Sequence, residues 1–432
     1  MNKRTSDSST FSFLSFPQLS NNLLTGTIPT EFSRLRDLQL LWLDDNMLEG
    51  DVSTTFNRMP FLRALFLEDN DFVGAIDDKF LRRSKNLIQL DVSNNRLTGS
   101  LPYHFFVQDE FVDLEVMDWH GNKLSGHLPD MLLPNQILQF LALYDNEFTG
   151  TLPNSWGTHL RNVFHLDLSH NLIEGELPSS IGQMSRLKRL FLGNNNWKPG
   201  PFPSSWSSLS ALEELSLKGS MRTGLLPDFL GEYPQLVFLD LDNNRFDGTV
   251  PTSLGQLSNL ELLLLNRNRL IGVIPPEFSH LTKLRAVLLE GNYIMGKADP
   301  LCGLPNFVDT QSGNLAVVVT DCEGDNSTLS AVECECCTLC CSAAPLLHVA
   351  INEDESNNDA TVKVLPSSNG TALHDVSNNA TSVPTGRPTC HDYTMTANLN
   401  PRWELVYTRD SYTLGERLWF NVDNPKRERR LV

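Results

Sequence analysis

The stretch LVFLDLDNNRFDGTVP, residues 236–251, decides the fold of this chain. Its leucines at positions 236, 239 and 241 are followed by Asn244, Gly248 and Pro251, and this order of residue types recurs along the chain. Aligned on the asparagine, the chain shows twelve turns that are mostly 24 or 25 residues apart, with one step of 27. The markers are Asn22, Asn46, Asn70, Asn95, Asn122, Asn146, Asn171, Asn195, Ser220, Asn244, Asn268 and Asn292. A fixed period of this length is typical of a solenoid.

Each position of the repeat has a physical role. Leu239 and Leu241 lie two residues apart, so both point to one face of a short strand and into the core. After the strand the backbone turns inside the solenoid, where Asn244 can donate to and accept from amides that have lost their ladder partners. Gly248 relaxes the backbone, and Pro251 favours an extended return path over a long helix.

The sequence therefore predicts an α/β-type leucine-rich-repeat solenoid of about twelve repeats. We expect it to be right-handed and curved, with a parallel β-sheet on the concave face and a mostly irregular or 3₁₀ convex side. One turn cannot bury its own leucines, so the turns must stack and the two ends need covers. Twelve strands spaced about 4.8 Å apart give an inner arc of roughly 55 Å, which suits a protein surface or a long peptide.

The L-x-G-x-I-P consensus with its 24-residue period resembles the plant-type extracellular leucine-rich-repeat family over residues 18–300. Members of that family are cell-surface receptors, co-receptors, secreted hydrolase inhibitors and wall proteins, so the resemblance implies recognition at the cell exterior. The family usually has a cysteine-paired cap before its first repeat, whereas the first cysteine here is Cys302. This departure predicts a truncated N-terminus, which would also explain why no signal peptide is readable.

The composition limits the class of partner. With 52 acidic and 34 basic residues among 432, the chain has a formal net charge of -18, which disfavours nucleic acid. The longest apolar run without charged side chains, from Leu339 to Ile351, is too short to cross a bilayer. We therefore expect no membrane span in this chain, and we leave its oligomeric state open.

The repeats divide the chain into five segments. We expect an N-terminal extension at 1–16, the solenoid at 17–300, and a cysteine-rich C-terminal cap at 301–341. A Ser-, Asn- and Thr-rich stretch at 342–388 has few large apolar residues and is predicted to be a disordered, glycosylated linker. Residues 389–432 regain aromatic side chains and are expected to form a small unassigned or incomplete module.

All eight cysteines follow the repeats: Cys302, Cys322, Cys334, Cys336, Cys337, Cys340, Cys341 and Cys390. An even number at the end of a secreted-type solenoid favours a disulfide-bonded cap, and the alternative is a zinc site. The stretch also resembles the cysteine-rich end cap of algal cell-surface proteins. Sequons at Asn326, Asn369 and Asn379 fit an exposed glycosylated segment, or chance in Ser- and Asn-rich sequence.

No phosphate-binding, zincin, hydrolase or kinase motif is present, and an open concave sheet rarely forms the closed pocket that catalysis needs. The sequence thus predicts a non-enzymatic protein with no catalytic residues, no metal and no cofactor. We expect a receptor-like recognition module for a protein or peptide, secreted or at the cell surface, that takes part in signal transduction. The alternatives are a secreted hydrolase inhibitor and a structural or adhesive wall protein.

Residues between and just after the strand leucines are predicted to face the ligand from the concave side. The candidates mix carboxylates with aromatic rings: Trp42, Asp44, Asp45, Phe66, Glu68, Asp69, Asp91, Asp118, Phe140, Tyr144, Asp167, Phe191, Phe238 and Asp240. Exposed aromatic residues in a band favour a partner that covers them, although exposed strand positions also tolerate such residues. We expect a basic or amphipathic partner across the early turns, anchored by Trp42 and Phe66 and steered by the acids beside them.

Two further features of the sequence have ordinary structural explanations. His120, His165 and His170 lie on nearby turns and are predicted to be isolated solvent-facing histidines rather than a metal site or a pH sensor. Between Lys198 and Arg222 the repeat is irregular, because Ser220 replaces the ladder asparagine. We interpret this irregularity as a tolerated defect, and a bulge that contacts a partner is the alternative.

Overall fold

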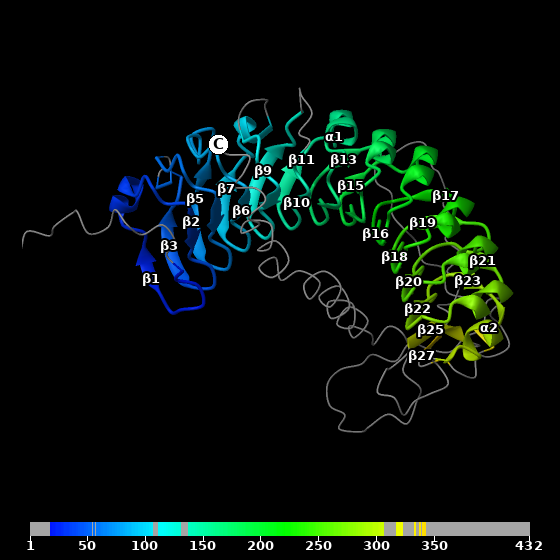
Figure 1. Ribbon diagram of the computed structural model, residues 1–432. Coiled ribbons are helices and arrows are strands. Elements are labelled where there is room, and N and C mark those ends of the chain that lie inside the picture. Colours follow the sequence, from blue (N-terminus) through cyan, green and yellow to red (C-terminus); the bar gives the residue numbers. More distant parts are fainter. Residues whose placement is uncertain are drawn as a thin grey trace, which may run out of the picture.

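The computed structural model describes residues 18–305 except 54, 57, 107–110 and 131–136, and in the cap 317–322, 332–333, 337 and 339–342. Within these residues the chain winds into an arc (Figure 1). The predicted extension at 1–16, the linker at 342–388 and the module at 389–432 lie outside them. So do Cys334, Cys336 and Cys390 and all three sequons.

One parallel sheet of thirteen strands lines the concave side of the arc, as predicted. Equivalent residues of successive turns stand side by side: Leu239 is aligned with Leu215 on one neighbour and with Leu263 on the other. The first marker, Asn22, follows a single bridge between Gln18 and Trp42 instead of a full strand. The strands are β2 (Leu40–Trp42), β4 (Ala64–Phe66), β6 (Gln89–Asp91), β8 (Val116–Asp118), β10 (Phe140–Ala142), β12 (His165–Asp167), β14 (Arg189–Phe191), β16 (Glu214–Ser216), β18 (Phe238–Asp240), β20 (Leu262–Leu264), β22 (Ala286–Leu288), β25 (Val317–Cys322) and β27 (Leu339–Ser342).

From Asn70 to Asn292 the ladder asparagines are buried, and each joins its turn to the one before it. The Asn146 side-chain nitrogen donates to the carbonyls of Leu143 and Tyr144 in its own turn and to Trp119 in the preceding turn. Its carbonyl oxygen accepts the backbone N–H of Leu124, also in the preceding turn. This pattern confirms the predicted polar ladder and gives each turn a specific register against its neighbour.

The return path forms a second parallel sheet, the lateral sheet, which the sequence did not predict. Its strands follow the ladder asparagines, and side chains alternate between the core and the outside. The strands are β1 (Thr25–Thr27), β3 (Met47–Asp51), β5 (Asp71–Ile76), β7 (Arg96–Gly99), β9 (Lys123–His127) and β11 (Glu147–Thr149). Two-stranded pairs continue it: β13 (Glu174–Gly175) with β15 (Asn196–Trp197), β17 (Thr223–Leu225) with β19 (Arg245–Asp247), β21 (Ile271–Gly272) with β23 (Tyr293–Ile294), and β24 (Gly296–Lys297) with β26 (Val332–Glu333).

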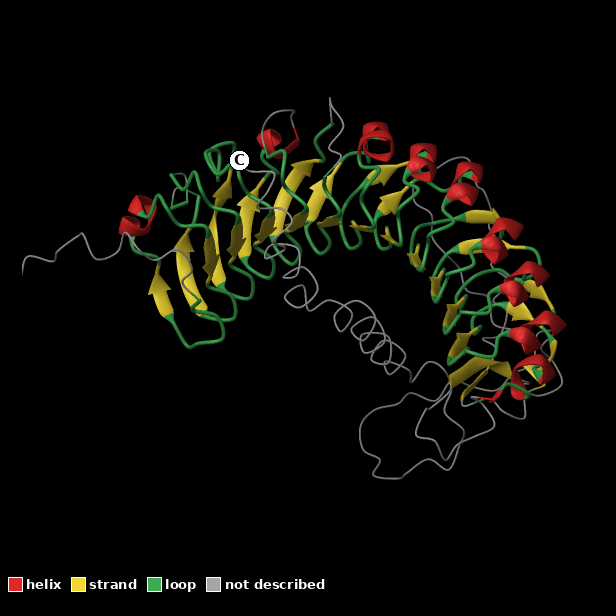
Figure 2. Ribbon diagram, viewed as in Figure 1, coloured by secondary structure: helices red, strands yellow, loops and turns green. Residues whose placement is uncertain are grey.

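Short helices occupy the convex side, which confirms the predicted 3₁₀ character (Figure 2). Most begin directly after the repeat proline, as η6 does after Pro251, because the fixed φ of proline suits the start of a helical turn. They are η1 (Thr30–Arg34), η2 (Tyr103–Phe106), α1 (Asn154–His159), η3 (Ser179–Gln183), η4 (Ser204–Ser208), η5 (Asp228–Glu232), η6 (Thr252–Gln256) and η7 (Pro276–His280). Between the helices and the sheets, the repeat leucines form one continuous apolar core.

The residue before each ladder asparagine adopts a left-handed backbone. Examples are Asp45 with φ 51°, Asp145 with φ 53° and Arg267 with φ 54°. This region is costly for most residues with a side chain, although Asn and Asp tolerate it better. The sharp exit from each concave strand therefore depends on a strained or specially tolerant residue at this position.

The cap extends the solenoid instead of simply covering it. Strand β25 pairs with β22, and β27 pairs with β25, so the concave sheet continues past the last repeat. The carboxylate of Asp321 accepts the backbone N–H groups of Gly291 and Asn292, as a ladder side chain would. Cys302, in the helix α2 (Asp299–Cys302), and Cys337 are each disulfide-bonded.

The irregular turn at Ser220 is repaired from within. The indole N–H of Trp197 donates to the Leu192 carbonyl at 2.8 Å, and the guanidinium of Arg222 donates to the carbonyls of Ser220 and Lys198. Arg222 is buried where other turns carry an apolar side chain. These contacts support the interpretation of a tolerated irregularity.

Candidate ligand-binding face

Three lines of side chains cover the concave sheet. The first row holds the first residue of each strand, the second row holds the third residue, and the rim holds the two residues before each ladder asparagine. Of the predicted residues, Phe140 and Phe238 stand in the first row. The second row contains Trp42, Phe66, Asp91, Asp118, Asp167, Phe191 and Asp240, and the rim contains Asp44, Asp45, Glu68, Asp69 and Tyr144. The repeat alignment thus brings all fourteen to one face.

The aromatic side chains of this face are packed against one another. Trp42 on β2 and Phe66 on β4 stack with ring centroids 5.9 Å apart and planes 10° from parallel. They retain only 8% and 7% of their exposure, so the expectation that they stand exposed is wrong. The reason is geometric: side chains of adjacent strands are close enough for large rings to cover each other. Their role as ligand anchors stays a prediction.

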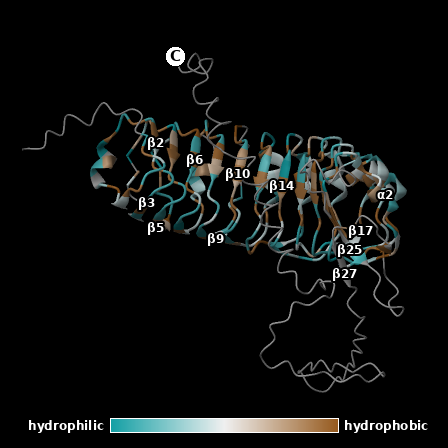
Figure 3. Ribbon diagram, turned by 90° about the horizontal axis from the view of Figure 1, so that it is seen from below, coloured by the Kyte–Doolittle hydropathy of each residue, from teal (hydrophilic) through white to brown (hydrophobic). Residues whose placement is uncertain are grey.

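A second aromatic group lies at the middle of the arc. The Phe140 and His165 rings stack at 4.3 Å, and His165 contacts Phe191 at 5.8 Å. His165 is buried, so the expectation that it faces solvent is wrong, and burial holds its pKa well below the ordinary value. Figure 3 shows the change of character along the sheet, from the hydrophilic β6 to the hydrophobic β10.

Carboxylates of the second row gather on the early and middle strands. Asp91 and Asp118 face each other across adjacent strands. Burial, together with the charge of Asp118, raises the pKa of Asp91 to about 8 against the opposing effect of His120. Burial also raises the pKa of Asp167 to about 7. This part of the face therefore changes its charge near neutral pH.

His120 is held by the acid next to it. Its Nδ1 atom lies 2.6 Å from Asp118 Oδ1, and its ring stacks on Tyr144 at 4.2 Å. Burial lowers its pKa, but the Asp118 carboxylate outweighs burial and raises the pKa to about 9. His120 is accordingly the cation of an ion pair, not an isolated histidine, whereas the ring of His170 contacts the amide of Asn194. Among the described residues, no group of three potential metal-ligating side chains was found.

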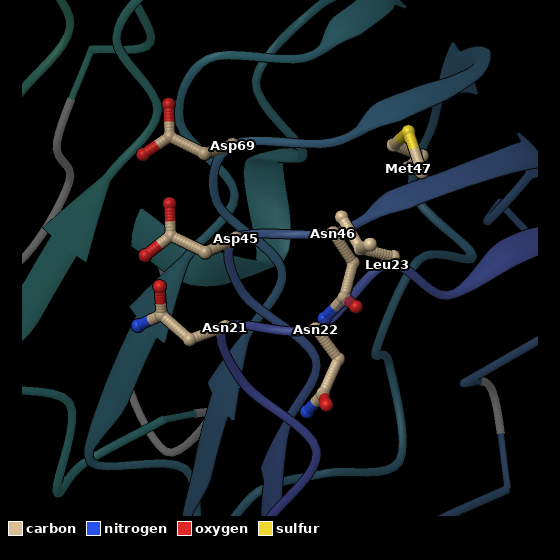
Figure 4. Close-up of a pocket in the computed structure, with 7 residues that line it drawn as sticks. All are labelled: Asn21, Asn22, Leu23, Asp45, Asn46, Met47 and Asp69. Atoms are coloured by element: carbon tan, nitrogen blue, oxygen red, sulfur yellow. The ribbon is translucent and has the colours of Figure 1, made fainter.

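The rim is acidic at the first turns. Asp45 and Asp69 line an open hollow of about 660 Å³, and Figure 4 shows them pointing the same way, one above the other. Partial burial and the neighbouring acids Asp69 and Asp44 raise the pKa of Asp45, and burial and Asp91 raise the pKa of Glu68 well above its ordinary value. Each ionised carboxylate makes ionisation of its neighbour harder, and a nearby positive charge removes this repulsion. The rim therefore favours contact with a positively charged group.

The later turns carry charges that the sequence analysis overlooked. Arg189 in the first row donates to Glu214 at 2.6 Å, and the guanidinium of Arg267 on the rim is bound by both oxygens of Asp242. Lys218 lies 3.9 Å from the same Asp242 carboxylate. Because Arg189 and Glu214 align with Phe238 in adjacent strands, the repeat alignment that found Phe238 could have found them.

A smaller hollow of about 120 Å³ opens between β12 and β18. Phe191, Phe238 and Tyr144 contribute to its wall, together with the carboxylates of Asp167 and Asp240. It forms where Gly193 has no side chain between the rim residues of the neighbouring turns. The small hollow has room for one side chain of an elongated ligand, whereas the larger hollow is open to solvent at the edge of the face.

Comparisons with known proteins agree with this geometry. Leucine-rich-repeat family models match residues 234–294, 86–107 and 162–184. Receptor-like protein 18 of Arabidopsis thaliana is 36% identical over 192 residues, which is 39% of this chain and 22% of that protein. The chain spans between 11% and 22% of the length of the curated plant proteins it matches.

Two solved structures share the fold. The ectodomain of the Arabidopsis receptor kinase HAESA, in complex with a peptide hormone ligand, is 26% identical with a TM-score of 0.61, over 76% of this chain and 51% of that one. The leucine-rich-repeat protein LIC12759 of Leptospira interrogans is 31% identical with a TM-score of 0.55, over 66% of this chain and 68% of that one. Within the residues that the structure describes, no helix is long and apolar enough for a bilayer.

Proposed function

We propose that this chain, a member of the leucine-rich-repeat family, binds a peptide or protein along its concave face at the cell surface or outside the cell. The observation that carries the proposal is the acidic rim of Asp44, Asp45, Glu68 and Asp69, which lies beside the stacked pair Trp42 and Phe66 on an open sheet. An acidic rim favours association with a basic or amphipathic partner, because complementary charge speeds encounter and rejects wrong partners.

Similarity to peptide-binding ectodomains supports the same reading. The HAESA structure contains a peptide hormone ligand, and the curated plant relatives include several receptor-like proteins. A long sheet with small hollows suits an extended peptide, whose alternate side chains can enter successive depressions. Both hollows found on this face among the described residues open to solvent, so a non-enzymatic binding role accounts best for their shape.

The proposal is tested by selecting peptides from a random displayed library on the full chain. Selected peptides are then measured against Asp45→Asn/Asp69→Asn. Asparagine tolerates the left-handed backbone that both positions require, so the change removes charge and keeps the turn. The matched control is Asp228→Asn/Glu232→Gln on the convex helix η5.

We expect the selected peptides to be rich in Lys and Arg. The rim variant should weaken their binding roughly tenfold, which corresponds to about 1.4 kcal/mol, while the convex control binds as the unchanged chain does. Peptides without basic enrichment, or equal binding to both variants, would contradict the acidic rim as the recognition surface.

The extracellular location has its own test. Protein purified from its own cells is digested without reduction and analysed by mass spectrometry. Disulfide-linked cysteine peptides from the cap and sugar on Asn326, Asn369 or Asn379 are expected for an extracellular protein. Free thiols and bare asparagines would place it in a reducing compartment and rule out the extracellular part of the proposal.

A further inference from the structure

The outward side of the lateral sheet carries an apolar patch near each end of the arc. At the first turns, Leu23, Met47 and Val73 are 82%, 46% and 41% exposed. The carboxylates of Glu49 and Asp51 lie on the same outward side of strand β3 as Met47, because they follow it by two and four residues. Figure 4 shows Leu23 and Met47 together, on the side opposite to Asp45 and Asp69. We call these five residues the N-terminal lateral patch.

The last turns carry a patch of opposite charge. Ile271 and Tyr293 are paired across β21 and β23, and Val273 and Met295 come directly after the ends of these two strands. All four are between 42% and 54% exposed. The exposed side chains of Arg245 and Arg269 border them, since Arg245 begins β19 and Arg269 lies two residues before Ile271. The exposed Asp247 lies on the same side of β19 as Arg245, so the border is mixed with an excess of positive charge. We call the four apolar residues and the two arginines the C-terminal lateral patch.

Apolar clusters of this kind require an explanation. Core-facing positions of the lateral sheet are already filled by the continuous core, and the patch side chains leave about half of their surface or more exposed to solvent. Between them the outward positions include polar and charged residues, as in Lys123, Ser125 and His127 on β9, and the single exposed leucines Leu172 and Leu225. Contiguous exposed apolar side chains with a charged border mark association surfaces in soluble proteins.

We infer that a second copy of this chain covers both patches, with the N-terminal lateral patch of each copy against the C-terminal lateral patch of the other. The two patches lie on the same lateral side of the arc, one on the six-stranded sheet and the other on the pair β21 and β23 that continues it. Two arcs placed face to face and antiparallel therefore bring both contacts together around one two-fold axis. Glu49 and Asp51 then oppose Arg245 and Arg269, and apolar side chains meet at both ends.

The two-fold arrangement matters for the area of contact. A specific interface buries about 1,200–2,000 Å² in total, which a single small patch does not supply. Repetition of the contact by symmetry doubles the buried apolar area and uses both charged borders. The second copy would cover Leu23 and Met47, which also line the open hollow beside Asp45 and Asp69, while the rest of the concave face stays open. Sedimentation and peptide binding measure the two interactions separately, so either can fail without the other.

Charge exchange provides a test that uses only the full chain. The all-acidic variant is Arg245→Glu/Arg269→Glu, and the all-basic variant is Glu49→Lys/Asp51→Lys. The matched control, Asp228→Lys/Glu232→Lys on the convex side, makes the same change of charge as the all-basic variant, but away from both patches. Circular dichroism melting first establishes that every variant is folded, and sedimentation velocity then gives the mass of each.

We expect the unchanged chain and the control to sediment as dimers at micromolar concentrations. Each patch variant alone should be monomeric, with dimerisation weakened at least tenfold, because like charges then oppose each other in both contacts. An equimolar mixture of the two variants should restore the dimer, since opposite charges meet again at both ends. A monomeric unchanged chain, or patch variants that still dimerise alone, or a mixture that stays monomeric, would overturn the inference.

Discussion

Replacement of one ladder asparagine tests how much the polar ladder stabilises the solenoid. In Asn146→Ala, the N–H of Leu124 loses its acceptor, and the carbonyls of Trp119, Leu143 and Tyr144 each lose one of two donors. The remaining donors are Asn122, Asn171 and the Gly121 N–H. A buried polar group without a partner costs about 1–3 kcal/mol, and carbonyls tolerate the loss better than N–H groups. The second donors keep the three carbonyls hydrogen-bonded, so the Leu124 N–H dominates the cost and we expect the free energy of unfolding to fall by about 2 kcal/mol.

The matched control is Asn22→Ala at the open end of the ladder. Asn22 is exposed, and its side-chain nitrogen donates to Leu19 and Ser20 in its own turn. We expect its loss to cost less than about 0.5 kcal/mol, as for most surface substitutions. Urea denaturation followed by tryptophan fluorescence measures both variants. If Asn146→Ala and Asn22→Ala shift the midpoint equally, the bonds between turns are not the source of the ladder's stability.

Two further predictions follow from buried groups. Trp197→Phe removes the indole N–H that donates to the Leu192 carbonyl at the irregular turn. We expect this change to lower the free energy of unfolding by about 1–3 kcal/mol in the same urea assay. An unchanged midpoint would show that the contacts of Arg222 alone stabilise this turn. Burial raises the pKa of Asp91 to about 8 in the folded chain, so the unfolded chain loses this proton first, and stability falls as pH rises from about 4 to 8. Asp91→Asn should therefore gain in relative stability over that interval when its midpoints are measured against pH, and parallel curves would refute the assignment.

The parts of the fold that one turn specifies could be predicted from the sequence. Leu239 and Leu241 announce a strand with one buried face, and Asn244 announces the turn that follows. The lateral sheet was missed because its strands are short and their outward residues, such as Glu174 and Thr223, vary freely. Pairing of those strands comes from the stacking of turns, which no single repeat encodes.

The concave face was predictable in position but not in exposure. Alternation within a strand tells which side chains point away from the core, and it placed Trp42 and Phe66 correctly on the second row. It cannot tell that the two rings stack across strands 24 residues apart in sequence. The repair of the irregular turn was hidden for the same reason, because Lys198 and Arg222 are equally distant along the chain.

The left-handed backbone limits which residue types can occur directly before a ladder asparagine. Asp45, Asp69 and Asp145 all occupy that position, and aspartate is among the few residues with a side chain that accept it readily. Their charge is thus partly a by-product of chain geometry, available to a ligand without having been selected for one. Arg267 is not one of the residue types that tolerate this backbone readily, and its paired contact with Asp242 explains its presence at this position. In any solenoid of this type, an acidic rim therefore indicates the left-handed backbone of the turn first, and the charge of a partner only second.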